Sequence, residues 1–182
     1  KGEDLDLPNR ERVDQILEVL EKATYQVTRV AKGKRRRRPQ PPFVTSTLQA
    51  VGSSRLHFSP RQTMRLAQQL YEGIDLEGER FGLITYMRTD STHVAPEAQQ
   101  EARAYIEEHW GKRFLPSKPP RYRSKSRLAQ EAHEAIRPTS VLRTPEAMRR
   151  HLDDRQARLY ELIWKRFVAS QMKPAVYETI SV

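Results

Sequence analysis

Gly82-Leu83-Ile84-Thr85-Tyr86-Met87-Arg88-Thr89-Asp90-Ser91-Thr92 is the stretch that decides how this chain is interpreted. It places a tyrosine hydroxyl, a guanidinium and several small hydroxyls within a few residues. A phenol with a pKa of about 10 needs a base to take its proton, or a nearby cation to favour the phenolate. Arg88 can serve as that cation, and a guanidinium can also bind two phosphate oxygens at once. These residue types predict attack of Tyr86 on a phosphodiester.

The spacing of Tyr86 and Arg88 also has a purely structural interpretation. Side chains two apart in an extended segment share a face, so we expect Ile84, Tyr86 and Arg88 to lie together. On its own, a Tyr-x-Arg pair behind apolar residues is more often a half-buried strand with a surface ion pair. The polar side chains of residues 89–91 are expected to brace the tyrosine loop through local hydrogen bonds.

Three segments of the chain match, in order, the signature segments of one enzyme family. They are Pro41–Gln49 (PPFVTSTLQ), Ile84–Thr92 (ITYMRTDST) and Glu131–Thr139 (EAHEAIRPT). Through them the chain resembles the bacterial type IA DNA topoisomerases. The similarity extends from about Leu7 to Val182, and the family's metal-binding Toprim domain would precede residue 1. We therefore expect the chain, which begins without methionine, to be a piece of a longer enzyme.

The resemblance implies a transesterification that relaxes negatively supercoiled DNA. Tyr86 would attack single-stranded DNA, hold the 5′ phosphate as a phosphotyrosine and release a 3′ hydroxyl, so that resealing needs no ATP. Arg88 would bind DNA and stabilise charge on the non-bridging oxygens, as fixed cations do in phosphoryl transfer. His133 would bind and position the phosphate, and the same match assigns Arg137 a DNA contact.

The resemblance also implies Mg²⁺ in the full-length enzyme, held by an acidic cluster of the Toprim domain. No metal site is expected within this chain, because its Asp4-Leu5-Asp6 pattern lies in a tail that leads into a helix and is interpreted as solvated charge. The implied partners are single-stranded DNA and the remaining topoisomerase domains, and we expect a monomer. The chain by itself is expected to be inactive in relaxation.

His133 and Arg137 are four residues apart and would share a face if residues 129–136 were helical, with the following proline ending the helix. Such a pair is, on its own, also typical of a helix surface. Glu131 and Glu134 could orient the histidine or neutralise neighbouring arginines, and neither is assigned a catalytic role.

The charge balance points to a nucleic-acid partner. The 182 residues include 33 Lys and Arg against 23 Asp and Glu, a formal net charge of +10, as expected of a chain that binds phosphates. A basic protein without such a partner would have the same composition. The absence of cysteine excludes disulfides and thiol catalysis. With no apolar run of about 18 residues and no signal peptide, the chain is expected in the cytoplasm and not in a membrane.

Two alternatives of another class remain open at this point. A non-catalytic helix-turn-helix-like DNA-binding module would explain the charge and the capped helices, but it gives no reason for a tyrosine followed by an arginine and hydroxyls. A structural or interaction domain would show no salt-dependent affinity for DNA.

Strand-like segments frame a helical middle. Residues 8–23 have apolar residues at helical spacing, residues 24–30 alternate like a half-buried strand, and the alternation returns at residues 175–182. Residues 32–42 contain five consecutive cations and three prolines, which predict an exposed linker that either contacts phosphates or only connects domains.

The predicted fold is mainly α with a minor β part. Residues 1–38 would hold the first helix and strand of an incomplete β-containing arch domain and the basic linker. Residues 39–173 would form the helical active-site tyrosine domain, and residues 174–182 the returning strand. The resemblance implies that this helical domain, helix-turn-helix-like, is inserted between strands of the arch.

Cap signals predict five helices in the middle of the chain. They begin at Thr45 or Ser46, at Ser59-Pro60, at Pro96, at Thr144-Pro145 and at Asp153. The inner faces are expected to carry Met64, Ala67, Leu70 and Tyr71 in the second, Ala98, Ala102, Tyr105 and Ile106 in the third, and Leu159, Ile163 and Phe167 in the last. Residues 73–81 are expected to form a solvated acidic loop and not a metal site.

Overall fold

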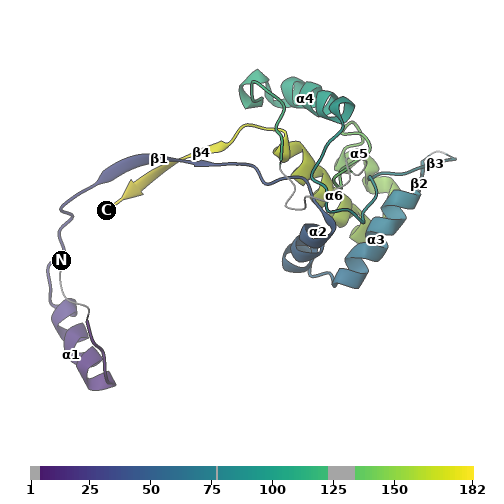
Figure 1. The fold of residues 1–182 in the computed structure, drawn as a ribbon. Helices are drawn as coiled ribbons and strands as arrows, with labels where there is room; N and C mark the ends of the chain where they lie inside the picture. Colours follow the sequence, from purple (N-terminus) through teal and green to yellow (C-terminus); the bar gives the residue numbers. More distant parts are fainter. Residues whose placement is uncertain (1–4, 77, 123–133) are drawn as a thin grey trace. The chain divides into compact units, whose positions relative to one another are not determined.

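The computed structural model describes residues 5–76, 78–122 and 134–182. The described chain is mainly helical with two small two-stranded sheets, which confirms the predicted fold class. It divides into two compact units, one made of Lys1–Arg35 with Val176–Val182 and the other of Arg36–Ala175. Assignment of the first unit to an arch domain stays a prediction. Figure 1 shows the helices α2 to α6 of the second unit gathered together.

The second unit contains all of the predicted middle helices. They are α2 (Thr45–Val51), continued by the π-helical turn η1 (Gly52–Leu56), then α3 (Pro60–Glu72), α4 (Pro96–Trp110), α5 (Pro145–Met148) and α6 (Asp154–Ser170), with 3₁₀ turns η2 (Lys112–Phe114) and η3 (Arg149–His151). Their starts follow local chemistry. Ser59 and Asp153 accept hydrogen bonds from backbone N–H groups of the first turns of α3 and α6, which supplies partners for otherwise unpaired donors.

The start of α2 differs from the prediction. Its N-cap is Val44, whose backbone N–H donates to the Thr47 hydroxyl at 3.0 Å. Neither Thr45 nor Ser46 caps the helix. The Thr45 hydroxyl instead donates to the Met87 carbonyl in the tyrosine segment.

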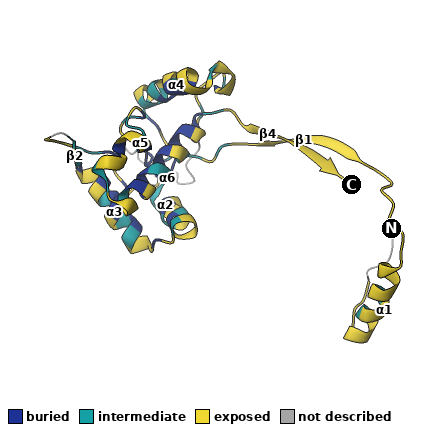
Figure 2. Cartoon of the chain, turned by 180° about the vertical axis from the view of Figure 1, so that it is seen from behind, coloured by how far each residue is buried: buried dark blue, intermediate teal, exposed yellow. Residues whose placement is uncertain are grey.

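The core of the second unit lies around α6, whose buried face is dark blue in Figure 2. Leu159, Ile163 and Phe167 are buried as predicted, and burying each such side chain stabilises the fold by about 1.5–3 kcal/mol. Two polar groups of the same helix are satisfied internally. The Tyr160 hydroxyl donates to the Arg143 carbonyl at 2.6 Å, and the Trp164 indole donates to the Val141 carbonyl at 3.0 Å.

The first unit contains a helix and most of a two-stranded sheet. Helix α1 (Arg10–Glu21) begins after the N-cap Asn9, and its apolar residues Leu17 and Leu20 are exposed. Strand β1 (Ala31–Arg37) pairs with β4 (Ala175–Ser181). The predicted position of the first strand was wrong. Residues 24–30 form no strand, and most of the cationic run that was assigned to a linker lies in β1.

A second correction concerns residues 73–81, which were expected to be a solvated loop. Strands β2 (Ile74–Leu76) and β3 (Glu79–Phe81) form an antiparallel hairpin that pairs Ile74 with Phe81. The turn is closed by Asp75, whose carboxylate accepts the Gly78 N–H at 3.0 Å, while Gly78 has a φ of 92° that favours glycine. The hairpin leads directly from α3 into the tyrosine segment.

Candidate active site

Three chain segments far apart in sequence lie side by side around Tyr86. Ile136 forms an isolated antiparallel bridge with Phe43, and Pro138 forms another with Ile84. The Ile136 N–H donates to the Phe43 carbonyl at 2.8 Å, which fixes the first pairing. The segment around residues 134–139 therefore lies between the other two, and the described parts of all three signature segments meet at one place.

Thr85 fastens the tyrosine segment to this central segment. Its hydroxyl donates to the Ala135 carbonyl at 2.6 Å and accepts the Arg137 N–H at 3.0 Å, while its own N–H donates to the Arg137 carbonyl at 2.9 Å. The hydroxyl and the backbone N–H of Thr85 thus both bond to the central segment, at residues 135 and 137. The residue immediately before Tyr86 cannot move without breaking these contacts.

Thr45 fastens the segment on the other side of Tyr86. Its hydroxyl donates to the Met87 carbonyl at 2.7 Å and accepts the Thr89 N–H at 2.9 Å, and its own N–H donates to the Thr89 carbonyl at 2.9 Å. We call Thr45 and Thr85 the two threonine clips. Tyr86 lies between them in the chain.

The loop after the tyrosine is braced internally as predicted. The Thr89 hydroxyl accepts the Ser91 N–H at 3.0 Å, and the Ser91 hydroxyl accepts the His93 N–H at 3.1 Å. Both hydroxyl-bearing residues are buried. Asp90, between them, is exposed and lines the hollow beside Arg88.

Tyr86 itself is 43 % exposed, whereas its neighbours Ile84 and Met87 are each 1 % exposed. The predicted common face of Ile84, Tyr86 and Arg88 is therefore wrong, since Ile84 lies in the core and the chain bends at residues 87–88. The buried neighbours anchor the segment. The phenol is left at the surface, where a strand of nucleic acid can reach it.

The Tyr86 ring packs edge-to-face on the ring of Tyr71, with centroids 5.3 Å apart. Tyr71 was predicted to face inward from α3, but it is half-exposed beside Tyr86. The end of α3 reaches the tyrosine segment closely: the Leu83 N–H donates to the Leu70 carbonyl at 2.8 Å. At Gly82 an added Cβ would lie 2.7 Å from the Tyr71 carbonyl oxygen, so only glycine allows this approach.

Arg88 is exposed and borders an open hollow of about 470 Å³. The hollow is lined by Thr45, Ser46, Gln49, Arg88, Thr89 and Asp90. The signature segment Pro41–Gln49 and the tyrosine segment thus supply all of its walls. A guanidinium at the rim of a polar hollow can bind phosphate oxygens.

Arg137 is positioned differently from what the sequence suggested. Residues 134–138 are extended and not helical, because they pair with the other two segments; the rest of the proposed helix, with His133 and Glu131, lies outside the described residues. The Arg137 side chain is buried, donates to a Glu134 carboxylate oxygen at 2.6 Å and to the Pro138 carbonyl at 3.0 Å, and is only 9 % exposed overall. These contacts hold Arg137 to its own segment, and its contact with DNA stays a prediction.

Glu134 joins two segments through its two carboxylate oxygens. One accepts from Arg137, and the other accepts the Ala95 N–H at 2.6 Å just before α4. The neutralisation of an arginine by Glu134, left open from the sequence, is confirmed. Neither the Glu134 contact with Ala95 nor the threonine clips have a local sequence signal, since those partners are 39 or more residues apart in the chain.

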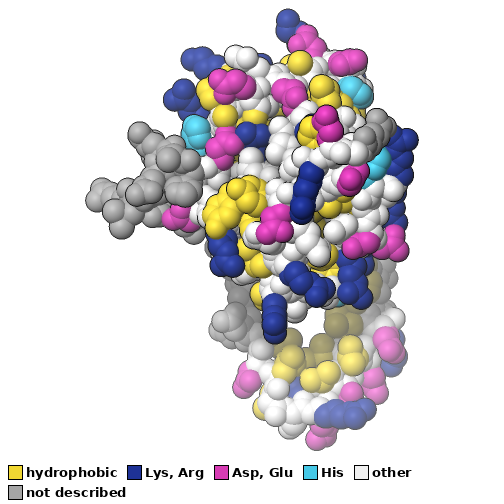
Figure 3. Space-filling view, turned by 90° about the vertical axis from the view of Figure 1, so that its right-hand side faces the viewer, with side chains coloured by type: hydrophobic (Ala, Val, Ile, Leu, Met, Phe, Trp, Pro, Cys, Tyr) yellow, Lys and Arg dark blue, Asp and Glu magenta, His cyan; other side chains and the backbone are white. Residues whose placement is uncertain are grey.

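The described residues show neither a metal-binding cluster nor a membrane-spanning helix. In the described ranges, no group of three or more His, Asp or Glu side chains is placed to hold a metal ion. None of the described helices is long and apolar enough to cross a membrane. On the face in Figure 3, Lys and Arg side chains alternate with Asp and Glu side chains, so the excess positive charge does not form one continuous field there.

The chain was compared with known protein families, proteins and structures. A family model described as DNA topoisomerase matches residues 1–182. DNA topoisomerase 1 of Campylobacter jejuni is 46 % identical over 182 residues, which are 100 % of this chain and 26 % of that protein. DNA topoisomerase 1 of Xylella fastidiosa is 54 % identical over 157 residues, 86 % of this chain and 19 % of that protein.

The solved structures give the same answer. Full-length topoisomerase I from Thermotoga maritima superposes with a TM-score of 0.79 at 42 % identity, covering 91 % of this chain and 26 % of that one. The chain thus spans about a quarter of the length of these proteins. Because the family model covers every residue and the convergent segments are those of the tyrosine site, the chain belongs to the bacterial DNA topoisomerase family.

Proposed function

We propose that the chain supplies the nucleophile of a type IA topoisomerase, with Tyr86 attacking single-stranded DNA. The observation that carries the proposal is the exposed Tyr86 held between two threonine clips while its chain neighbours are buried. A half-buried strand tyrosine with no chemistry would not need a loop fixed on both sides. Preorganisation of this kind keeps a reacting atom in place and lowers the entropy lost at reaction.

The proposed reaction exchanges one phosphoester for another. The Tyr86 oxygen forms a bond to phosphorus, the bond from phosphorus to the 3′ oxygen breaks, and the phenol proton is transferred so that the strand leaves as a 3′ hydroxyl. The 5′ phosphate remains on the tyrosine. The reverse attack by the 3′ hydroxyl restores the strand without ATP, because the phosphotyrosine conserves the bond energy.

Arg88 and His133 have supporting roles in this proposal. Arg88 would bind the non-bridging oxygens from the rim of the hollow, where it stabilises charge that develops during the transfer. His133, from the family resemblance, would position the same phosphate. Arg137 contributes by fixing the central segment through Glu134, a positioning role that its burial supports.

The whole protein is proposed to be a longer, monomeric enzyme in the cytoplasm that relaxes negatively supercoiled DNA. The described residues include no group of three or more His, Asp or Glu side chains that could hold a metal ion. We propose that Mg²⁺ acts in the full-length enzyme, with its ligands in a Toprim domain outside this chain.

The test is formation of a covalent adduct in the full-length protein. A 5′-labelled or 3′-labelled single-stranded oligonucleotide is incubated with the protein and run on a denaturing gel. We expect the label downstream of the break, on the 5′-phosphate side, to migrate with the protein, and Tyr86→Phe to abolish the adduct while retaining DNA affinity. Tyr71→Phe, which keeps the neighbouring ring, is the matched control and should still form it.

Two outcomes would contradict the proposal. An adduct that persists in Tyr86→Phe would place the nucleophile elsewhere. Salt-sensitive binding by the unaltered protein with no adduct under any condition would favour the non-catalytic DNA-binding module instead.

A further inference from the structure

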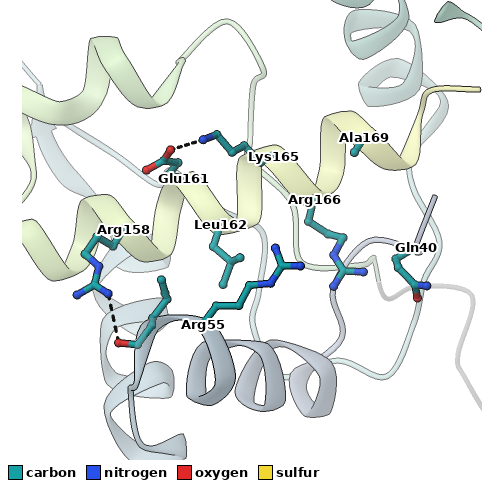
Figure 4. A pocket seen from close by; sticks show the side chains of 9 residues that line it. Gln40, Arg55, Arg158, Glu161, Leu162, Lys165, Arg166 and Ala169 are labelled. Atoms are coloured by element: carbon teal, nitrogen blue, oxygen red, sulfur yellow. Dashed lines mark hydrogen bonds and ion pairs between the residues drawn. The ribbon is translucent and has the colours of Figure 1, made fainter. Parts of the chain in front are cut away.

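A second basic site lies in the helical unit, in a cleft of about 430 Å³ between η1 and α6 (Figure 4). Four cations line it: Arg55, Arg158, Lys165 and Arg166. Glu161 is the single acidic residue in the lining. The cleft shares no lining residue with the hollow beside Arg88, so it is a separate feature of the surface.

Two of the four cations are already engaged. Arg158 donates to the Leu56 carbonyl at 3.3 Å and lies over the Phe58 ring at 5.3 Å. Lys165 is paired with Glu161 one turn before it on α6. The only acid of the lining is therefore committed to a lysine, and it leaves the remaining two cations without a counter-charge inside the cleft.

Arg55 and Arg166 are those two cations. Figure 4 shows their guanidinium groups directed toward one another from η1 and from α6. No hydrogen bond or ion pair joins either guanidinium to another residue of the described ranges. Arg166 lies over the Phe43 ring, 4.4 Å away, and interacts electrostatically with Tyr122. Burial lowers the pKa of Arg166 from its ordinary value, the adjacent Arg55 charge lowers it further, and Tyr122 acts in the opposite direction.

We propose that Arg55 and Arg166 bind a backbone phosphate of a DNA strand in the cleft between η1 and α6, at a site distinct from the one at Tyr86. The proposal rests on the proposed function only in taking the ligand to be DNA. A phosphodiester shares one negative charge between two non-bridging oxygens, and each guanidinium presents a planar fork of donors that fits them. One such anion would replace the repulsion between the two cations with two attractions.

The rest of the cleft suits a nucleotide better than a free anion. Leu56 and Leu162 form apolar parts of its wall, and Gln40 adds an amide near Arg166 (Figure 4). A sugar can pack on the aliphatic side chains while the phosphate meets the guanidiniums.

The cleft is connected to the tyrosine site through Phe43. The Phe43 ring lies under Arg166, and the Phe43 carbonyl accepts the Ile136 N–H of the central segment. Two residues further along the chain is the clip residue Thr45. Direct contacts through Phe43 therefore connect the cleft with the segment that fixes the tyrosine loop.

The experiment measures binding of a fluorescent single-stranded oligonucleotide to the full-length protein at several salt concentrations. Arg55→Gln and Arg166→Gln are each expected to weaken binding about fivefold at low salt. Each should also make the slope of log K against log salt concentration shallower by about 0.7, the value for one lost phosphate contact on a single strand. Arg61→Gln, an exposed arginine of α3 with the same change in charge, is the matched control and should change affinity far less.

Arg55 carries the test because it is exposed and its replacement leaves the core intact. Arg55→Lys should recover part of the affinity, since it restores the charge but not the fork. Thermal unfolding of Arg166→Gln is measured in parallel, so that loss of its packing on Phe43 is not mistaken for loss of a phosphate contact. Equal affinity of Arg55→Gln and Arg61→Gln would overturn the proposal.

Competition identifies the ligand. A non-labelled oligonucleotide should displace the probe from the unaltered protein more effectively than polyglutamate or inorganic phosphate does at equal charge. Displacement by polyglutamate that depends on Arg55 as strongly as displacement by DNA would overturn the assignment to DNA. If the protein forms no covalent adduct, the proposed function fails, yet a difference between Arg55→Gln and Arg61→Gln still supports a phosphate site in the cleft.

Discussion

At the scale of single residues, two threonine hydroxyls differ in their hydrogen bonding: that of Thr85 is fully bonded, and that of Thr63 has no partner in the described part of the chain. The Thr85 hydroxyl makes short hydrogen bonds on both sides of the central segment. The Thr63 hydroxyl on α3 is fully buried and has no partner in the described part of the chain. A satisfied hydroxyl stabilises the fold, whereas a buried unsatisfied one carries a desolvation cost.

Replacement of these residues with valine, which has the same shape, should therefore give opposite results. We expect Thr85→Val to lower the free energy of unfolding by about 1–3 kcal/mol, because the Arg137 N–H and the Ala135 carbonyl lose their partner. Thr63→Val should leave stability unchanged or raise it. Urea unfolding of both variants measures this, and Thr85→Val should also slow adduct formation. A larger loss in Thr63→Val than in Thr85→Val would contradict this account.

Sequence patterns select Tyr86 and Arg88 as candidate site residues but do not identify the residues that hold the segment around them. Thr45 was interpreted as a helix cap because Ser and Thr before an apolar run usually are. Its true partners are the carbonyls of Met87 and Thr89, 42 and 44 residues away. Such pairing leaves no local periodicity, so one sequence cannot show it.

At the scale of elements, predictions succeeded where the signal was local. Asp153 and Ser59 lie next to the turns that they cap, and helices α6 and α3 begin where these residues predict. The predictions failed where pairing with a distant strand determines the secondary structure. The cationic residues of β1 have low strand propensity, yet pairing with β4 makes them a strand. The same holds for the hairpin β2–β3, whose turn chemistry at Asp75 and Gly78 went unrecognised.

The cap of α6 gives an element-scale prediction. The Asp153 carboxylate accepts the Arg155 and Gln156 N–H groups, both at 2.8 Å. Asp153→Ala should lower the free energy of unfolding of the helical unit by about 1 kcal/mol. Fluorescence follows this unit alone, because both tryptophans, Trp110 and Trp164, lie in it. Asn9→Ala, which removes the cap of α1 in the other unit, is the control and should leave the transition midpoint in place.

At the scale of the whole molecule, the chain contains the proposed nucleophile Tyr86 but spans only about a quarter of the length of its relatives. Relaxation needs both ends of a cut strand to be held while another strand passes, which demands more protein than one tyrosine domain. The chain expressed by itself should therefore leave a supercoiled plasmid unchanged, with or without Mg²⁺, and the full-length protein should relax it. Agarose gels measure both. Catalytic relaxation by the chain alone that is lost in Tyr86→Phe would contradict the prediction.

The wide sequence separation of the threonine clips has a consequence for synthesis of the protein. Thr85 is joined to partners 50 and 52 residues away, so the loop around Tyr86 cannot be assembled until residue 137 has left the ribosome. Contacts of such range form late, because the chain must close a long loop before they stabilise anything. A nascent or partly folded chain therefore has an unpositioned phenol. If Tyr86 is the proposed nucleophile, DNA cleavage requires a complete helical unit and is lost when that unit unfolds.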